Sequence, residues 1–269
     1  MSSISRAPSC CDDMPETGTL KVEDARQKIL AAIEPITASE KLTLRNALGR
    51  VLAEDIISPI SVPGHTNSAM DGYALAGIGL PQGSDRIYNI IGKSLAGAPF
   101  NGSCDSGQCV RIMTGAVMPS GTDTVVMQEH VETLDPERIR IDDRHHAGQN
   151  VRQAGEDIAA GSAVLHSSHT LTPADIGVLS SLGIGEVRVR RRPRVAFFST
   201  GDELRSIGEP LKQGDVYDSN RYSLYGMLKR LGVELLDMGV VRDNAEDLRK
   251  AFSEAASMAD VVITSGGVS

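Results

Sequence analysis

The sequence predicts a multidomain α/β protein: a helical or mixed first domain carries an inserted β-rich domain and precedes part of a parallel α/β domain. Three changes of pattern predict this class. Helical spacing of apolar residues gives way to short β-branched runs, then returns, and finally yields to alternating strands and helices. The expected divisions are a disordered tail at 1–18, domain I at 19–57 plus 150–192, β-rich domain II at 58–149, and domain III at 193–269.

Domain I is expected to contain three short helices. Apolar residues keep helical spacing from Lys21 and stop before Pro35, which predicts the first helix. A second helix is expected at 42–48. A third is expected at 173–182, where Gly183 ends the periodic run.

Domain II is expected to be all β, because short β-branched or alternating runs are separated by turn residues. The runs lie at 86–91, 108–113 and 123–127. Cys104 and Cys109 in this region have no second cysteine pair or well-placed histidine to complete a zinc site. We interpret them as structural thiols.

The other histidines and the arginine run are interpreted as surface residues without a specific binding role. His145 and His146, like His166 and His169, have a spacing seen in metal sites, yet no cysteine or fixed helix accompanies them, so we expect solvated loop histidines. The arginine run at 188–194 could hold an anion, but Pro193 interrupts it between two domains. A solvated strand and linker is the favoured interpretation.

Domain III shows the alternation of a parallel α/β sheet. The expected elements are a buried strand at 195–198, a helix from about Arg221, a strand at 233–240, a helix capped by Asn244, and a strand at 261–264. Because the sequence stops just after a strand, we expect a fragment of a longer domain.

Composition excludes several classes of protein. The 27 basic and 35 acidic side chains give a net charge of −8, and there is neither a broad basic stretch nor a tryptophan, so nucleic acid is not an expected partner. No apolar run is long enough to span a membrane, and the N-terminal residues lack the apolar core of a signal peptide. We expect a cytoplasmic protein without membrane contact.

Three segments predict an anion-binding edge. In open parallel sheets, ligands bind beyond the carboxyl ends of the strands, where glycines and helix N-termini favour anions. Segments 198–203, 239–243 and 263–267 each end a strand in this way and together indicate a phosphorylated ligand. Neither a P-loop nor a dinucleotide fingerprint is present. Asp71-Gly72, by contrast, is equally typical of a tight turn.

Seven motifs, in order, resemble the MoeA family of molybdopterin molybdenumtransferases, which includes the E domain of gephyrin. The resemblance covers about residues 20–269. The motifs are 67–74 (NSAMDGYA), 111–116 (RIMTGA), 121–129 (GTDTVVMQE), 155–158 (GEDI), 192–204 (RPRVAFFSTGDEL), 218–220 (DSN) and 263–269 (ITSGGVS).

The resemblance implies transfer of molybdenum from molybdate to adenylylated molybdopterin, with release of AMP and a dependence on Mg²⁺. It implies a homodimer with a composite active site, a MogA-like three-layer domain III, and a β-barrel domain IV that this chain would lack. A MogA-type adenylyltransferase is a candidate partner. Two rivals share the fold: a gephyrin-like scaffold, which the retained acids and the lack of a fused module disfavour, and an isolated molybdopterin-binding module, which would not need domain II.

The resemblance also implies the site residues. The catalytic set is Asp71, Thr114, Asp157, Glu203 and Asp243, of which Glu203 and Asp243 would bind the metal. The molybdopterin-binding set is Ser199, Thr200, Gly201, Asp202, Ser265, Gly266 and Gly267. The sequence departs from the family pattern at His65 and Thr66, before the first motif, and at His169, where a glycine is common and a positive φ is expected.

Overall fold

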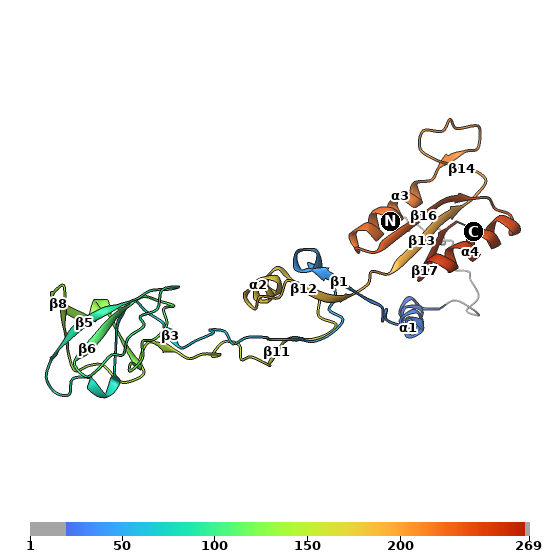
Figure 1. The fold of residues 1–269 in the computed structure, drawn as a ribbon. Helices are drawn as coiled ribbons and strands as arrows, with labels where there is room; N and C mark the ends of the chain where they lie inside the picture. The colour runs from blue at the N-terminus through green and yellow to red at the C-terminus, as the bar shows by residue number, and fades with distance from the viewer. Residues whose placement is uncertain (1–19, 267–269) are drawn as a thin grey trace, which may run out of the picture. The chain divides into compact units, whose positions relative to one another are not determined.

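The structure is a computed structural model that describes residues 20–266 (Figure 1). The contacts of the chain define two compact units. One unit is formed by residues 39–190, and the other by residues 20–38 and 191–266 of the described chain. The expected tail at 1–18 and the site residue Gly267 lie outside the described residues.

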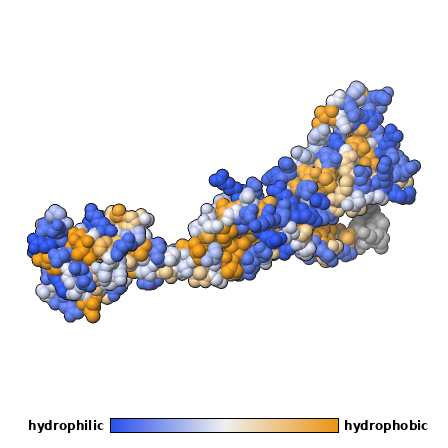
Figure 2. Space-filling model, viewed as in Figure 1, coloured by the Kyte–Doolittle hydropathy of each residue, from blue (hydrophilic) through white to orange (hydrophobic). Residues whose placement is uncertain are grey.

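The 39–190 unit has one core around its first and last strands. Strand β1 (Ser39–Thr43) pairs antiparallel with β12 (Glu186–Arg190), and the 3-10 turn η1 (Leu44–Ala47) and helix α2 (Pro173–Ser181) accompany them. The core residues are Leu44, Ala47, Leu52, Ile56, Leu171, Leu179, Val187 and Val189. Figure 2 shows apolar surface gathered over the α2 region.

The helix expected at 42–48 was wrong, whereas the helix at 173–182 is confirmed. Five residues up to Thr43 pair with β12, which supplies their backbone hydrogen bonds. Only residues 44–48 remain before Gly49, and four of them form η1; the φ of 73° at Gly49 ends the turn. That length is too short for an α-helix, so long-range pairing overrides the local pattern.

Short antiparallel pairs connect this core with a six-stranded sheet in the same unit. Strand β2 (Ile56–Ile57) pairs with β11 (Ala163–Leu165), and β3 (Asn67–Ser68) with β10 (Val151–Arg152). The sheet has the order β7-β4-β6-β5-β9-β8. Its strands are β4 (Gly72–Leu75), β5 (Arg86–Ser94), β6 (Gln108–Ile112), β7 (Thr124–Met127), β8 (Val131–Asp135) and β9 (Arg138–Ile141), with 3-10 turns η2 (Gly77–Gly79) and η3 (Gln128–His130).

The sheet confirms the strands expected in this region, and both thiols of the region are buried. Tyr88, Ile139 and Ile141 are buried in that core. Cys104 and Cys109 are both buried and free, and burial raises the pKa of the Cys109 thiol to about 12.

The second unit contains the expected parallel sheet, in the order β16-β13-β17. The strands are β13 (Arg194–Thr200), β16 (Glu234–Val241) and β17 (Val261–Ser265), and the helices are α3 (Ser219–Arg230) and α4 (Ala245–Met258). Asn244 caps α4 as expected, accepting a hydrogen bond from the Asp247 N–H. Short strands β14 (Leu204–Arg205) and β15 (Val216–Tyr217) pair between β13 and α3.

Helices α3 and α4 cover opposite faces of this sheet. Phe197 packs with Leu228 of α3, whereas the Phe198 ring meets Phe252 of α4 edge-on at 5.2 Å. Successive strand residues point to opposite faces, so the described part of this unit has three layers. The first expected helix is confirmed as α1 (Val22–Ala32) and has no buried residue.

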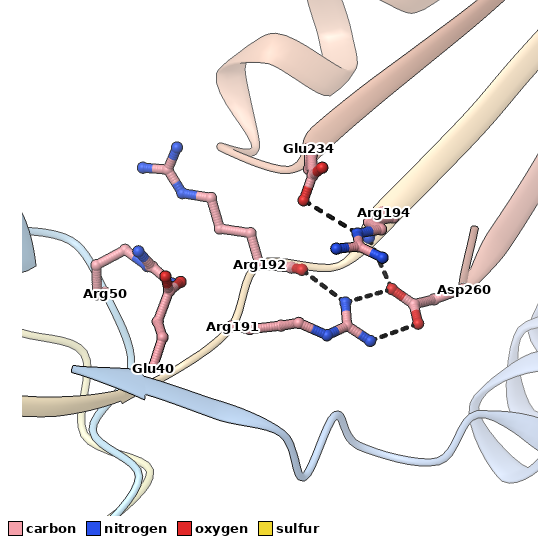
Figure 3. Close-up of polar contacts among 7 residues, drawn as sticks. All are labelled: Glu40, Arg50, Arg191, Arg192, Arg194, Glu234 and Asp260. Carbon is pink, nitrogen blue, oxygen red and sulfur yellow. Dashed lines mark hydrogen bonds and ion pairs between the residues drawn. The ribbon is translucent and has the colours of Figure 1, made fainter. Parts of the chain in front are cut away.

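The arginine run forms the end of β12 and the linker to β13, as expected, but several of its side chains are paired with acids. The Arg191 guanidinium donates to both carboxylate oxygens of Asp260 at 2.7 Å, and the Arg194 N–H donates to the same carboxylate (Figure 3). Arg50, which is also drawn there, donates to Glu40 at 2.6 Å. These ion pairs fix the ends of strands rather than leaving the run free.

The expectation of solvated loop histidines holds for His146, His166 and His169 but was wrong for His145, and the positive φ expected at His169 was also wrong. The His145 side chain is only 4% exposed and lies 5.8 Å from the His130 ring, and burial lowers its pKa. At the loop before α2, the positive φ of 69° falls on Ser168 and not on His169. His169 instead contacts Asp175 at 2.8 Å. Within residues 20–266, no helix is long and apolar enough to cross a membrane.

Candidate functional site

The three strand ends expected at one edge are brought together by the parallel sheet. Strand β13 ends at Thr200, β16 at Val241 and β17 at Ser265. The register pairs Thr200 with Val241 and Ser199 with Ser265, so the segments that follow emerge at the same edge. Two pockets flank the end of β13 at this edge.

The first pocket has a volume of about 200 Å³ and lies between the ends of β13 and β17 and the N-terminus of α3. Its lining is Thr200, Glu203, Leu204, Val216, Tyr217, Asp218, Ser219, Asn220, Ser265 and Gly266. Asn220 Nδ2 donates to Ser265 Oγ at 3.1 Å. Gly266 has a φ of 96°, and a Cβ there would lie 2.4 Å from the Thr200 carbonyl oxygen. This close approach requires glycine.

The second pocket, of about 470 Å³, lies on the β16 side of the same strand. Its lining is Gly201, Asp202, Leu204, Arg205, Ser206, Glu209, Val240 and Arg242. Asp202 Oδ1 accepts a hydrogen bond of 3.3 Å from the Asp243 N–H, which connects the segments after β13 and β16. Arg205 is paired with Asp215 at 2.9 Å.

The two expected metal ligands occupy different positions at this edge. Glu203 lines the first pocket, whereas Asp243 lines neither of the two. Between residues 20 and 266, no group of three or more His, Cys, Asp or Glu side chains is placed to hold a metal by itself. The buried Asp218 carboxylate is already held by Ser199 and Arg221, whereas the Glu203 carboxylate and the Ser265 hydroxyl are hard oxygen donors that line the first pocket. This set fits Mg²⁺, which needs only one or two protein carboxylates when substrate phosphates complete its coordination.

In the other unit, the structure joins Asp71 and Thr114. Asp71 Oδ1 accepts from both the N–H and the hydroxyl of Thr114, each at 2.8 Å. These hydrogen bonds, aided by the nearby Arg111 charge, lower the pKa of the Asp71 carboxyl. The Asp71 carboxylate is thus fixed in the ionised form in a half-buried loop.

Arg111 braces the segment that follows Asp71. Its guanidinium lies 5.0 Å from the centre of the Tyr73 ring, donates to the Tyr73 hydroxyl at 2.9 Å, and donates to Gln128. Gln128 in turn donates its N–H to the Asp71 carbonyl at 3.1 Å. Asp157, the second acid expected in this unit, is held separately by Arg152, whose Nη2 donates to both carboxylate oxygens at 2.6 and 2.5 Å.

These motifs and folds match known proteins. A family model described as the MoeA N-terminal region (domain I and II) matches residues 20–183. The chain belongs to the MoeA family. A second model, described as a probable molybdopterin binding domain, matches residues 196–269. The fold class predicted from the sequence, MoeA-type N-terminal domains followed by a MogA-like α/β domain, is confirmed.

Relatives from several organisms agree with this membership. The chain is 45% identical over 250 residues to a molybdopterin molybdenumtransferase of Haemophilus influenzae, covering 93% of this chain and 61% of the relative. It is 39% identical to one from Nostoc sp., covering 86% and 53%. A solved MoeA structure from Pyrococcus horikoshii has a TM-score of 0.84 at 31% identity, covering 91% and 66%. The chain thus spans roughly three-fifths of these MoeA relatives.

Sequence reasoning missed two charged residues beside the site. Asp218 is 2% exposed and lines the first pocket, and Arg221 is its charge partner. The DSN motif at 218–220 contains Asp218, but no sequence pattern indicates that Asp218 pairs with Arg221. The expected site residue Ser199 is buried and donates its hydroxyl hydrogen to Asp218 at 3.0 Å.

Proposed function

We propose that the protein carrying this sequence acts in molybdenum cofactor biosynthesis, transferring molybdenum from molybdate to adenylylated molybdopterin and releasing AMP. The main support for the proposal is that strands β13, β16 and β17 end at the same edge of the sheet, each close to a glycine, and that Glu203 lines the first pocket at this edge. The names of relatives in the same family, molybdopterin molybdenumtransferases, support a transfer of molybdenum, and the adenylylated substrate and the release of AMP are part of the proposal. An adenylylating enzyme of the MogA type would provide the substrate.

Residues at the sheet edge have distinct roles in this proposal. The Ser265 hydroxyl and the backbone around Gly266 would bind anionic oxygens of the substrate, as would Thr200 and Gly201. Glu203 would hold Mg²⁺ with Asp243 from the neighbouring strand end. When bound there, Mg²⁺ would supply positive charge to offset the negative charge that develops as the phosphoanhydride is cleaved. Asp202 would orient the Asp243 segment through its 3.3 Å hydrogen bond.

Asp71, Thr114 and Asp157 would complete the site from a second subunit. Ionised Asp71 carries a negative charge, so it would serve the reaction by orienting a donor or a metal-bound group, not by contacting an anion directly. Thr114 fixes the Asp71 carboxylate through two hydrogen bonds. A homodimer with two-fold symmetry would then contain two equivalent composite sites.

AMP release from adenylylated molybdopterin in the presence of molybdate tests the proposal in the full natural protein. We expect molybdate-dependent release by the wild type and loss of turnover in Glu203→Ala and Asp243→Ala. Glu254→Ala, an exposed residue of α4, is the control and should retain activity. Wild-type turnover in both site variants would reject the assigned residues, and a wild type without molybdate-dependent AMP release would reject the reaction.

Subunit mixing tests the composite site. Asp71→Ala and Glu203→Ala proteins should each be inactive alone, but mixed dimers would contain one intact site of two. Random pairing makes half of the dimers mixed, so about a quarter of wild-type activity is expected. If no activity returns although subunit exchange is demonstrated, the acids act within one chain.

A further inference from the structure

A buried charge network joins the ends of strands β13 and β16 near the candidate site. Asp218, whose side chain is 1% exposed, is its centre. Its Oδ1 accepts from the Ser199 hydroxyl at 3.0 Å and from the Arg221 N–H at 3.1 Å. One carboxylate oxygen thus ties the end of β13 to the first turn of α3.

Arg221 extends the network to β16. Its guanidinium is 12% exposed and lies between two carboxylates: Nε is 3.5 Å from Asp218 Oδ2, and Nη1 is 3.3 Å from Asp237 Oδ1. Asp237 Oδ1 also accepts from the Gly239 N–H at 3.0 Å. Arg221 therefore connects the buried carboxylate with a turn inside β16.

The turn inside β16 is a bulge. The register with β13 changes from Phe197 opposite Asp237 to Ser199 opposite Val240, which adds one residue to β16. Gly239 supplies a φ of 81°, and a Cβ there would lie 3.4 Å from Arg221 Nη1. Both the backbone angle and the space beside the guanidinium favour glycine.

A bulge determines where the rest of its strand points. Because side chains alternate along a strand, adding one residue moves every later side chain to the other face. The residues after this bulge lead to Arg242, which lines the second pocket, and then to Asp243. The position of the bulge along β16 therefore determines the direction in which Arg242 and Asp243 point at the sheet edge.

We propose that Arg221 and Asp237 are positioning residues, which hold the bulge of β16 in register and thereby set the position of Arg242 and Asp243. A gain in folding stability does not by itself explain why these charged residues are present, since buried ion pairs are often no more stabilising than apolar residues of similar volume. Specifying a register is the best-attested use of buried charges. The part of the inference that concerns turnover rests on the proposed function.

Amide hydrogen exchange tests the structural part without any substrate. In Asp237→Ala, exchange at residues 238–243 should rise by about tenfold or more, while strand 195–198 stays protected, because only the bulge loses its acceptor. Asp237 is 43% exposed, so this variant leaves no buried charge unpaired in the way that a change at Asp218 would. Arg230→Gln is the control, because Arg230 is an exposed arginine of α3, the helix that also carries Arg221. Exchange at 238–243 within twofold of that control would overturn the inference.

Kinetics of the full natural protein test the positioning role. Asp237→Ala and Arg221→Gln should each lower kcat for AMP release by about tenfold to a hundredfold with KM within about twofold, since misplacing a catalytic group costs this much. Arg221→Lys should recover part of kcat. The double variant should be little worse than either single one, because both changes break the same connection.

The outcomes separate this inference from the proposed function. Faster exchange with unchanged kcat, in a protein that Asp243→Ala inactivates, would overturn the positioning role. A wild type that releases no AMP would refute the proposed function. The exchange experiment would then still decide whether Arg221 and Asp237 hold the bulge.

Discussion

Asp260 provides a stability prediction that can be worked out from its contacts. Its carboxylate precedes β17 and accepts three hydrogen bonds of 2.7 Å, two from the Arg191 guanidinium and one from the Arg194 N–H (Figure 3). The side chain is 30% exposed, which weakens each contact through solvent screening. A bidentate charged pair with an added backbone donor should nevertheless contribute about 1–2 kcal/mol.

We therefore expect Asp260→Asn to lower the melting temperature of the unit that contains the parallel sheet. For a domain of about 100 residues, 1 kcal/mol corresponds to about 4–8 °C, measured here by calorimetry at pH 7. Glu234→Gln is the matched control: its pair with Arg194 is a single contact of 3.2 Å between side chains about half exposed. That control should change stability by less than about 0.5 kcal/mol.

The pH dependence gives the prediction a second test. Hydrogen bonds from Arg191 and Arg194 hold the pKa of Asp260 well below its usual value of 3.8. A carboxyl with a lowered folded pKa contributes stability above its unfolded pKa and loses it as the pH falls through the folded value. The difference between wild type and Asp260→Asn should therefore shrink below about pH 4. Equal melting temperatures for Asp260→Asn and Glu234→Gln at pH 7 would refute the reasoning.

Three further predictions concern local features. Asp175→Asn should lower the free energy of unfolding by about 1 kcal/mol at pH 7, because Asp175 completes the capping box of α2 with Thr172. Hydrogen bonds from Thr172 and His169 lower the Asp175 pKa to about 2. Calorimetry should therefore find that the stability difference between the variant and the wild type fades as the pH falls from 4 to 2. Gly266→Ala should destabilise more than Gly208→Ala in urea unfolding, because both have positive φ but only the first Cβ would meet backbone. Cys104 and Cys109 should resist iodoacetamide at pH 8 until urea unfolds the chain, as judged by mass spectrometry, since both thiols are buried with raised pKa values.

The parallel sheet could be predicted from sequence because its signals are local. Buried strands appear as continuous apolar runs, and Asn244 carries its own capping signal. The local sequence of the segment at 42–48 does not specify its structure. Its structure depends on β12, which lies more than a hundred residues later in the chain, and no local pattern reveals that pairing.

The candidate site shows the same division. Motifs identified Asp71 and Thr114 as separate positions, but only the fold shows that they share two hydrogen bonds. The family resemblance likewise implied that Glu203 and Asp243 share a metal, and only the fold shows that Glu203 lines the first pocket while the Asp243 N–H contacts Asp202. Side-chain partners distant in sequence depend on register and rotamer, which spacing does not specify.

The charges at the sheet edge lead to a final prediction. Four carboxylates, those of Glu203, Asp218, Asp202 and Glu209, line the two pockets. Among residues 20–266, Asp218 is paired with Arg221 and the Arg205 guanidinium with Asp215, while no ion-pair partner is found for Arg242, so Glu203, Asp202 and Glu209 face one unpaired arginine. An edge with this excess of negative charge should repel an anionic substrate unless a cation is present.

We therefore expect the wild type to bind AMP more weakly in EDTA than in Mg²⁺, measured by calorimetric titration of the full natural protein. Glu203→Gln should raise the affinity for AMP in EDTA by about two- to fivefold, because removing one charge about 4–8 Å from a phosphate relieves about 0.5–1 kcal/mol of repulsion in a solvated site. The same variant should gain less from Mg²⁺, since it also lacks the proposed metal ligand. Asp247→Asn, outside both pockets, controls for net charge. Equal wild-type affinity with and without Mg²⁺ would show that Arg242 and the backbone donors suffice to bind the anion, and would remove the reason for assigning a metal to Glu203.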